Sequence, residues 1–175
     1  PARSTASAAG STLMPDGSPL SWPVADLVSA FRRSELSPVE VATMALDRID
    51  KIDHELHAFV TVDRVMTLQQ AAESEARYRN GDPRALEGVP VSVKDAFHLQ
   101  GLPTTLGSLH HQHDIATDDS GVVKRLRGAG AVFTGKTNTA EFGQSATTDN
   151  LLGPDTGNPW DPTRTSGGSS GGAAA

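Results

Sequence analysis

The fold of this chain is most visible in ten residues, GVPVSVKDAF, at positions 88–97. Apolar and other side chains alternate there, with valines at 89, 91 and 93 separated by Pro90, Ser92 and Lys94. Because successive side chains of a strand point to opposite faces, this alternation predicts a β-strand that ends near Lys94. A lysine in such a valine-rich strand should lie at least partly in the protein interior.

The residues before this strand predict two helices. A first helix is expected over residues 21–34, where apolar side chains recur at helical spacing. The sequence SPVE at Ser37–Glu40 has the pattern of a capping box with proline at the first helical position, so a second helix should start there and run to about Asp53. We expect the second helix to bury Val41, Ala45, Ile49 and Ile52.

The remaining periodic segments alternate between strand and helix. In chain order they are a strand at His57–Val62, a helix over 63–79 that stops at Asn80 and Gly81, a helix capped by Ser120 that runs to about Arg127 and ends with Gly128 and Gly130, and the strand AVFTG at 131–135. Alternation of this kind is typical of an α/β domain. We therefore predict an α/β fold.

The composition limits the class of protein. The chain has 175 residues, the size of one domain, and no cysteine, which excludes disulfides, thiolate metal sites and cysteine nucleophiles. The net charge is −6 and the basic residues are scattered, so we predict no direct nucleic-acid binding. No apolar run reaches the roughly 20 residues of a membrane-spanning helix, so no membrane partner is predicted and a cytoplasmic location is the default expectation.

Residues 1–20 consist mainly of small side chains and lack the apolar core of a signal peptide. We expect them to form a disordered tail. Because the sequence starts with Pro1 and not with methionine, we expect the chain to be processed or to be a fragment at that end.

The last 33 residues, from Gly143 to Ala175, lose regular periodicity and hold seven of the 17 glycines. An irregular segment of this length is uncommon in a compact domain and tends to be functional. A disordered tail is the alternative, but Leu151, Leu152 and Trp160 are side chains that a solvated linker does not need. The segment includes GGSSGG at 167–172, whose glycines permit close approaches that side chains forbid, although the same composition also fits a flexible linker.

Two short patterns suggest ligand sites but have simpler explanations. GAVFTGKT at 130–137 has the spacing of a phosphate-binding loop, but a helix precedes Gly130 and the residues between the glycines form the predicted strand. The histidines of HHQH, at 110, 111 and 113, form one cluster without a second ligand group at a fitting spacing. A surface loop explains them better, and we predict no metal site.

Lys94 has two interpretations when it is considered alone. Its stem can pack while its ammonium group reaches water or pairs with Asp95, which is a structural role. Alternatively, because burial disfavours the charged form, a buried lysine can act as a general base.

Three blocks taken together resemble the amidase signature family of serine hydrolases. They are EGVPVSVKDAFHLQGLPTT at 87–105, LRGAGAVFTGKTNTAEFG at 126–143 and GNPWDPTRTSGGSSGGAAA at 157–175. The blocks are long and correctly ordered, and the resemblance covers about residues 21–175. It implies a mixed central β-sheet with helices on both sides, of which this sequence holds the N-terminal portion of a single domain.

The resemblance implies roles for individual residues. Lys94 matches the catalytic lysine of the family's Ser–cis-Ser–Lys triad, and Ser169 matches the bridging serine. A cis peptide bond is implied between Gly168 and Ser169. Ser170 is expected to support the arrangement by hydrogen bonding.

Two further positions, Gly143 and Ser145, match sites at which family members contact substrate. The nucleophilic serine of the family follows the glycine–serine run in a later GGS turn. The sequence ends at Ala175, before such a turn, so no residue here matches the nucleophile.

The activity implied by the resemblance is hydrolysis of a carbon–nitrogen amide bond through an acyl-enzyme. The substrate is a small-molecule amide, no metal or organic cofactor is needed, and no oligomeric state is predicted. We expect the 175-residue chain alone to be inactive.

Two alternatives stay open: the glutaminase (A) subunit of a tRNA-dependent amidotransferase, which shares the motifs, and a non-catalytic fragment or binding module. The former usually carries KDN where this sequence has Lys94-Asp95-Ala96, and a GSSTENS-like segment where it has GQSATTDN at 143–150.

Overall fold

The computed structural model describes residues 17–175, so residues 1–16 of the predicted tail lie outside the described residues. The end of the predicted tail is packed onto the fold, because Leu20 contacts the cluster of Leu27 and Phe31. The elements are η1 (Pro19–Ser21), α1 (Val24–Arg32), α2 (Pro38–Leu56), β1 (Phe59–Val62), α3 (Arg64–Arg79), β2 (Pro90–Lys94), η2 (Leu109–His111), α4 (Gly121–Gly128), β3 (Val132–Thr137), η3 (Glu141–Gly143), β4 (Gly157–Asn158), β5 (Asp161–Thr165) and α5 (Gly171–Ala174), where η marks a 3₁₀-helix.

The central sheet has three strands in the order β1–β3–β2. β3 runs parallel to β2 and antiparallel to β1, so the sheet is mixed, as expected. The register places Val93 beside Lys136 and Lys94 beside Thr137, and the carboxyl ends of the two parallel strands therefore lie side by side. Ligands of open α/β sheets bind at such an edge.

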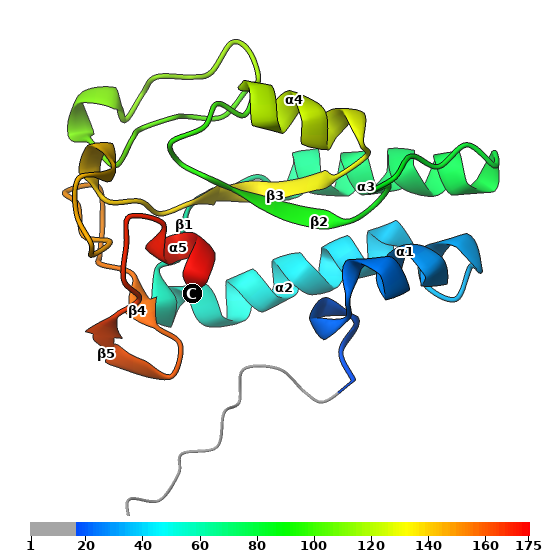
Figure 1. Cartoon of the computed structure of the whole chain (residues 1–175), viewed down its shortest axis with the longest axis horizontal. Coiled ribbons are helices and arrows are strands. Elements are labelled where there is room, and N and C mark those ends of the chain that lie inside the picture. The colour runs from blue at the N-terminus through cyan, green and yellow to red at the C-terminus, as the bar shows by residue number, and fades with distance from the viewer. Residues whose placement is uncertain (1–16) are drawn as a thin grey trace, which may run out of the picture.

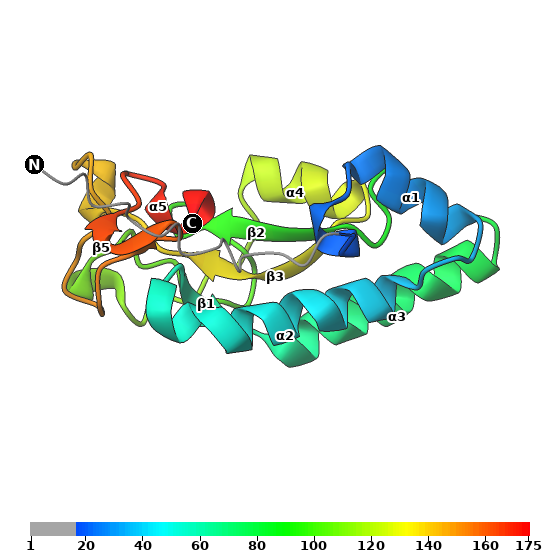
Figure 2. The same cartoon turned by 90° about the horizontal axis from the view of Figure 1, so that it is seen from below.

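Helices cover both faces of the sheet, which confirms the α/β prediction (Figures 1 and 2). α4 packs on one face through Val123, which shares a buried cluster with Phe133 of β3. α2 and α3 lie side by side against the other face, where Ala42 and Ala71 cluster with Val132. Burying a Val or Phe side chain stabilises a fold by about 1.5–3 kcal/mol, so these two clusters hold the layers together.

The capping box predicted at the start of α2 is present. The Ser37 hydroxyl accepts a hydrogen bond from the Val39 amide at 3.0 Å, and the Glu40 carboxylate accepts one from the Ser37 amide at 2.8 Å. α2 extends to Leu56 and is stopped by His57, whose φ of 51° is left-handed. Because His57 belongs to this stop, the strand predicted from His57 begins only at Phe59.

The buried face of α2 differs from the prediction. Three of the four predicted side chains are only half-buried, namely Ala45, Ile49 and Ile52. Val41 is buried as expected, but Ala42 and Leu46 take the other interior positions. The helix turns Ala42 inward because α3 packs along this side and brings Ala71 against it.

The other helices agree with their predictions to within a few residues. α3 matches the predicted range of 63–79, and α1 begins only after Pro23. Ser120 occupies the N-cap position of α4, but its hydroxyl donates to the His98 carbonyl at 3.3 Å and makes no capping bond.

The segment from Gly143 to Ala175 is not structureless, because it contains the β4–β5 pair and α5. The side chains of Leu151 and Trp160 are 80% and 77% exposed. The segment is therefore ordered, but these two apolar side chains do not anchor it.

Polar groups anchor this segment instead. The Asn150 amide donates to the Asn138 side-chain oxygen at 2.7 Å and to the Thr139 carbonyl at 2.9 Å. The Thr156 hydroxyl donates to the His57 carbonyl at 2.8 Å. These bonds tie the segment to the residues after β3 and to the end of α2.

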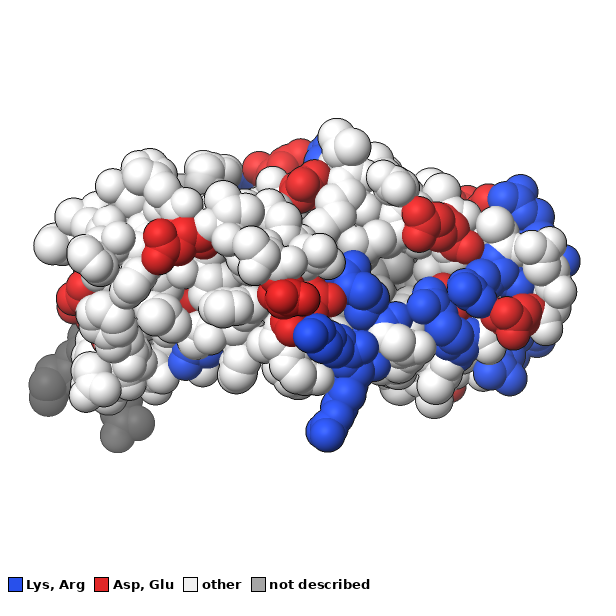
Figure 3. Space-filling model, turned by 90° about the horizontal axis from the view of Figure 1, so that it is seen from above, with Lys and Arg blue, Asp and Glu red and all other residues white. Residues whose placement is uncertain are grey.

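Charged side chains are spread unevenly over the face seen in Figure 3. Lys and Arg gather over the half that carries α4 and the C-terminal end of α3, whereas the opposite end is largely uncharged. Several basic residues in this half of the fold pair locally, including Arg127 with Asp119 at 2.5 Å and Arg84 with Glu87 at 2.6 Å. None of the helices within residues 17–175 is long and apolar enough to cross a membrane.

Candidate active site

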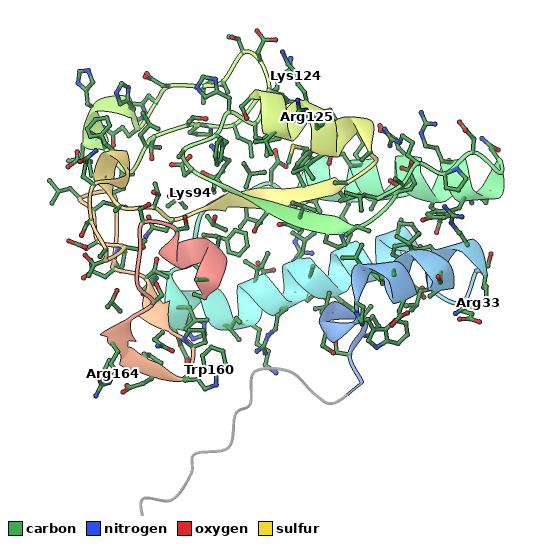
Figure 4. The ribbon with its side chains drawn as sticks, in the orientation of Figure 1. Arg33, Lys94, Lys124, Arg125, Trp160 and Arg164 are labelled. Atoms are coloured by element: carbon green, nitrogen blue, oxygen red, sulfur yellow. The ribbon has the colours of Figure 1, made fainter. Side chains whose placement is uncertain are left out.

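Lys94 is the last residue of β2, at the carboxyl edge of the parallel strand pair. Its half-buried side chain lies beside the start of α5 (Figure 4). The Nζ atom is 2.8 Å from the Ser169 hydroxyl and 2.9 Å from the Ser170 hydroxyl, although these serines lie 75 and 76 residues further along the chain. The structure thus brings together three side chains that the sequence analysis selected from two distant blocks.

Ser169 is docked against the residues that follow β3. Its carbonyl oxygen accepts a hydrogen bond from the Thr139 hydroxyl at 2.9 Å and another from the Ala140 amide at 3.2 Å. The peptide bond between Gly168 and Ser169 is cis, as the resemblance implied. Because β2 and β3 end side by side, this docking holds Ser169 next to the lysine at the end of β2.

The glycine–serine run is a packed segment and not a flexible linker. A Cβ atom at Gly168 would collide with the Thr147 carbonyl group, and a Cβ atom at Gly171 would collide with the Thr148 hydroxyl. Gly171 and Gly172 are both buried. The glycines are therefore needed for close approach, which was one of the two interpretations that the sequence left open.

The two predicted substrate-contact residues lie at different places. Gly143 has a left-handed φ of 68°, and a Cβ atom there would lie 3.7 Å from the Ser169 hydroxyl. Ser145 is exposed, and its hydroxyl is 2.7 Å from the Thr147 hydroxyl. Gly143 thus borders the lysine–serine pair, whereas the bonds of Ser145 stay within its own loop. A substrate contact for either residue stays a prediction.

A second lysine near the site was not predicted to belong to it. Lys136 is fully buried, and its Nζ donates to Asp95 Oδ1 at 2.7 Å, to the Pro103 carbonyl at 2.8 Å and to the Thr104 hydroxyl at 3.0 Å. Burial lowers the pKa of Lys136, and the adjacent Asp95 carboxylate partly offsets that effect.

This ion pair corrects one interpretation of Lys94. Asp95 pairs with Lys136 and not with Lys94, so the structural role in which Asp95 neutralises Lys94 is wrong. The sequence contains a hint of the pairing between Asp95 and Lys136. Lys136 directly follows the predicted strand AVFTG, so it lies near the end of a strand, as Asp95 does. In the sequence, Lys136 otherwise stands out only as part of the phosphate-loop pattern at 130–137.

The two short patterns that suggested ligand sites have structural explanations. Residues 130–137 of the phosphate-loop pattern hold β3 itself, whose six residues are all buried. The histidines at 110 and 111 belong to η2 at the surface, where His111 Nδ1 lies 2.7 Å from Asp114. Within the described part of the chain, no three His, Asp or Glu side chains are grouped so that they could hold a metal ion.

The lysine and the two serines are suited to proton transfer. In its uncharged form an amine that contacts a hydroxyl can accept the hydroxyl proton and later return it. Lys94 forms no ion pair among residues 17–175, so no carboxylate there competes for its amine. The fold and the site together define the class: an α/β protein with a lysine–serine pair at the carboxyl edge of a mixed sheet, an arrangement that can transfer protons.

Comparison with known proteins agrees with this class. The family model described as Amidase matches residues 40–175, more than half of the chain. The chain belongs to the amidase signature family.

Relatives from curated proteins and solved structures cover most of the chain. The A subunit of glutamyl-tRNA(Gln) amidotransferase from Aromatoleum aromaticum is 43% identical over 150 residues, which are 86% of this chain and 31% of that subunit. A bacterial aryl acylamidase of the amidase signature family superposes with a TM-score of 0.84 at 34% identity, over 90% of this chain and 34% of that one. The peptide amidase from Stenotrophomonas maltophilia gives a TM-score of 0.80 at 33% identity, over 87% of this chain and 33% of that one. The chain thus spans about a third of the length of these relatives.

Proposed function

We propose that this chain forms the N-terminal third of an amidase that hydrolyses the carbon–nitrogen bond of a small-molecule amide. The observation that carries the proposal is the 2.8 Å contact between Lys94 Nζ and the Ser169 hydroxyl, in a chain of the amidase family. In the experiments below, "the complete protein" means the product of the whole open reading frame that encodes this chain.

In the proposed mechanism, uncharged Lys94 accepts a proton from the Ser169 hydroxyl. Ser169 takes a proton in turn from a nucleophilic serine that follows residue 175, and the oxygen of that serine attacks the amide carbonyl carbon. The proton returns through Ser169 to the leaving amine as the carbon–nitrogen bond breaks. Water then attacks the acyl-enzyme by the same relay, which releases the carboxylic acid and regenerates the serine.

The other candidate residues have supporting roles in this proposal. Ser170 holds the lysine amine from a second side, at 2.9 Å. Gly143 borders the Ser169 hydroxyl and leaves room for substrate next to it, and Ser145 contacts substrate from the adjoining loop. The proposal assigns the nucleophile to neither Ser169 nor Ser170, because the match to the family's motif gives Ser169 the bridging role and Ser170 a supporting one.

Substitution of the two relay residues in the complete protein tests the proposal. Acetamide, acetanilide, an amidated dipeptide and glutamine serve as the substrate panel. Lys94→Ala and Ser169→Ala should each lower kcat/KM by about 10²–10⁴-fold, the usual contribution of a positioned acid–base group. Lys124→Ala, which changes an exposed lysine on α4, is the matched control and should leave kcat/KM unchanged. Near-parental activity of either relay variant would refute the mechanism.

A second candidate is the glutaminase subunit of a tRNA-dependent amidotransferase. It is supported by curated relatives with that name, including the subunit from Salinispora tropica at 43% identity over 157 residues. Ala96 and the segment 144–150 depart from the usual motifs of that subunit. Hydrolysis of glutamine that depends on a co-purifying partner subunit would favour this candidate, whereas hydrolysis of acetanilide or the amidated dipeptide by the protein alone would favour the amidase.

We also propose that the 175-residue chain has no activity by itself. Turnover of the panel by the isolated chain would contradict this proposal. A complete open reading frame that stops at Ala175 would instead favour a non-catalytic binding module.

A further inference from the structure

The backbone around Ser169 and Ser170 is closed by the hydroxyl group of one buried threonine. Thr148 Oγ1 donates to the Gly167 carbonyl at 2.7 Å and accepts from the Gly171 amide at 2.9 Å. The two serines that contact Lys94 lie between these two glycines. One hydroxyl therefore joins both ends of the turn that carries them, and the mechanism above assigns it no role.

The turn is built around this hydroxyl. Thr148 is only 1% exposed, and its oxygen occupies the place that a Cβ atom of Gly171 would fill. The polar backbone groups of an irregular buried segment need partners from outside regular secondary structure. Without the Thr148 hydroxyl, the Gly167 carbonyl and the Gly171 amide would lose a partner that they now share.

A second threonine hydroxyl holds the middle of the same turn. Thr139 is 1% exposed and donates to the Ser169 carbonyl at 2.9 Å. The Ala140 amide donates to the same carbonyl at 3.2 Å, so this contact is partly duplicated. Thr148 alone spans the turn, and Thr139 reinforces one point in it.

We propose that Thr148, assisted by Thr139, is a positioning residue that holds the Ser169 and Ser170 hydroxyls within hydrogen-bond reach of Lys94. The inference rests on the proposed amidase function. Neither threonine touches the lysine amine, so both act through the backbone of the serines. Because a misplacement of about 1 Å can reduce a reaction rate by about 100-fold, loss of the Thr148 hydroxyl should reduce turnover more than substrate binding.

Four variants of the complete protein test this inference on the panel amide that the parent turns over fastest. Thr148→Val keeps the shape of the side chain but removes the hydroxyl, and should lower kcat by about 10–100-fold with KM changed by less than about 3-fold. Thr148→Ser restores the hydroxyl and should stay within about 3-fold of the parent kcat. Thr139→Val should lower kcat by about 3–10-fold, because the Ala140 amide still holds Ser169.

Thr137→Val is the matched control. Thr137 is buried on β3 beside Lys94, and its Oγ1 is the buried side-chain oxygen without a hydrogen-bond partner in residues 17–175. The same exchange there removes no hydrogen bond, so kcat should match that of the parent. Peptide-level hydrogen exchange over residues 166–172 adds a readout besides activity, and should be faster in Thr148→Val only.

The outcomes separate this inference from the proposed function. Parental kcat in Thr148→Val, while Lys94→Ala and Ser169→Ala are inactive, overturns the positioning role alone. Parental kcat in Lys94→Ala overturns the proposed function itself. If Thr148→Val does not fold, Thr139→Val decides, and an unchanged kcat in that variant overturns the inference.

Discussion

Two lysines lie near the carboxyl edge of neighbouring parallel strands, and their surroundings are opposite. Lys136 of β3 is fully buried, and its ammonium group meets the Asp95 carboxylate at 2.7 Å. Lys94 of β2 is half-buried, and within the described residues its hydrogen bonds go to the hydroxyls of Ser169 and Ser170. A carboxylate favours the charged form of a lysine, and at Lys136 it partly offsets the effect of burial on the pKa, whereas a hydroxyl can exchange a proton with an amine. The partner, and not the residue type, separates the structural lysine from the one that we propose to be reactive.

Lys136 also supports the segment that follows Lys94. Asp95 follows Lys94 directly, and its carboxylate accepts hydrogen bonds from the Thr105 amide at 3.2 Å and from the Thr105 hydroxyl. Lys136 reaches the carbonyl of Pro103 at 2.8 Å. The ion pair therefore fastens residues 95–105 to β3, next to the position where Lys94 leaves the sheet.

Exchange of each lysine for methionine is the strongest test of this contrast. Lys136→Met leaves the Asp95 carboxylate buried without its partner, and such a loss destabilises a protein by about 3–5 kcal/mol. Lys94→Met leaves no buried charge unpaired, so its effect on the free energy of unfolding should stay below about 1 kcal/mol. Urea unfolding of the complete protein measures both.

The double variant Asp95→Asn/Lys136→Met is the control for the unpaired charge, and should recover part of the stability lost in Lys136→Met. Equal destabilisation by Lys94→Met and Lys136→Met would remove the distinction between the two lysines.

Acidification tests another buried carboxylate, that of Glu87. Burial would raise the pKa of Glu87, but hydrogen bonds from Arg84 and Ser74 outweigh it and hold the pKa below its ordinary value. A carboxyl group of this kind stabilises the fold above its unfolded pKa of about 4.3, and the contribution is lost as the pH falls through the folded value. We expect Tm to fall as the pH drops below about 5, and to fall less in Glu87→Gln. The same decrease in both proteins would show that Glu87 is not responsible.

The smallest effects are expected in the β4–β5 hairpin, where Trp160 lies apart from Lys94 (Figure 4). Trp160→Ser should change the free energy of unfolding by less than about 0.5 kcal/mol, because its side chain is 77% exposed. Asn150→Ala removes three hydrogen bonds, two of which anchor the same segment, and should cost about 1–3 kcal/mol. Thermal unfolding ranks the two variants, and a larger loss for Trp160→Ser would show that apolar contacts hold the segment after all.

Much of the fold could be predicted because its signals are local. The alternation at 88–97 and the capping box at Ser37 depend only on neighbouring residues, and both predictions are confirmed. The inward face of α2 was predicted less well, since Ala42 and not Ala45 is buried. Helical periodicity gives the spacing of a buried face, but the neighbouring helix decides how that face is rotated.

The candidate site was predictable only where its residues form a recognisable pattern. Lys94 and the serines of GGSSGG were selected from two separate blocks, and the structure brings them into contact. Lys136 and Thr148 were missed as parts of the same region. The partners of each are supplied by segments distant in the chain, so no local pattern identifies them.

By itself the sequence determined the order of helices and strands and the resemblance to a family. Periodicity, capping and glycine placement carry that information because they act over a few residues. Only the tertiary structure decided which carboxylate neutralises which lysine, and which hydroxyl closes the serine turn. Those choices depend on distances between residues far apart in the chain, and packing of the sheet against its helices sets these distances.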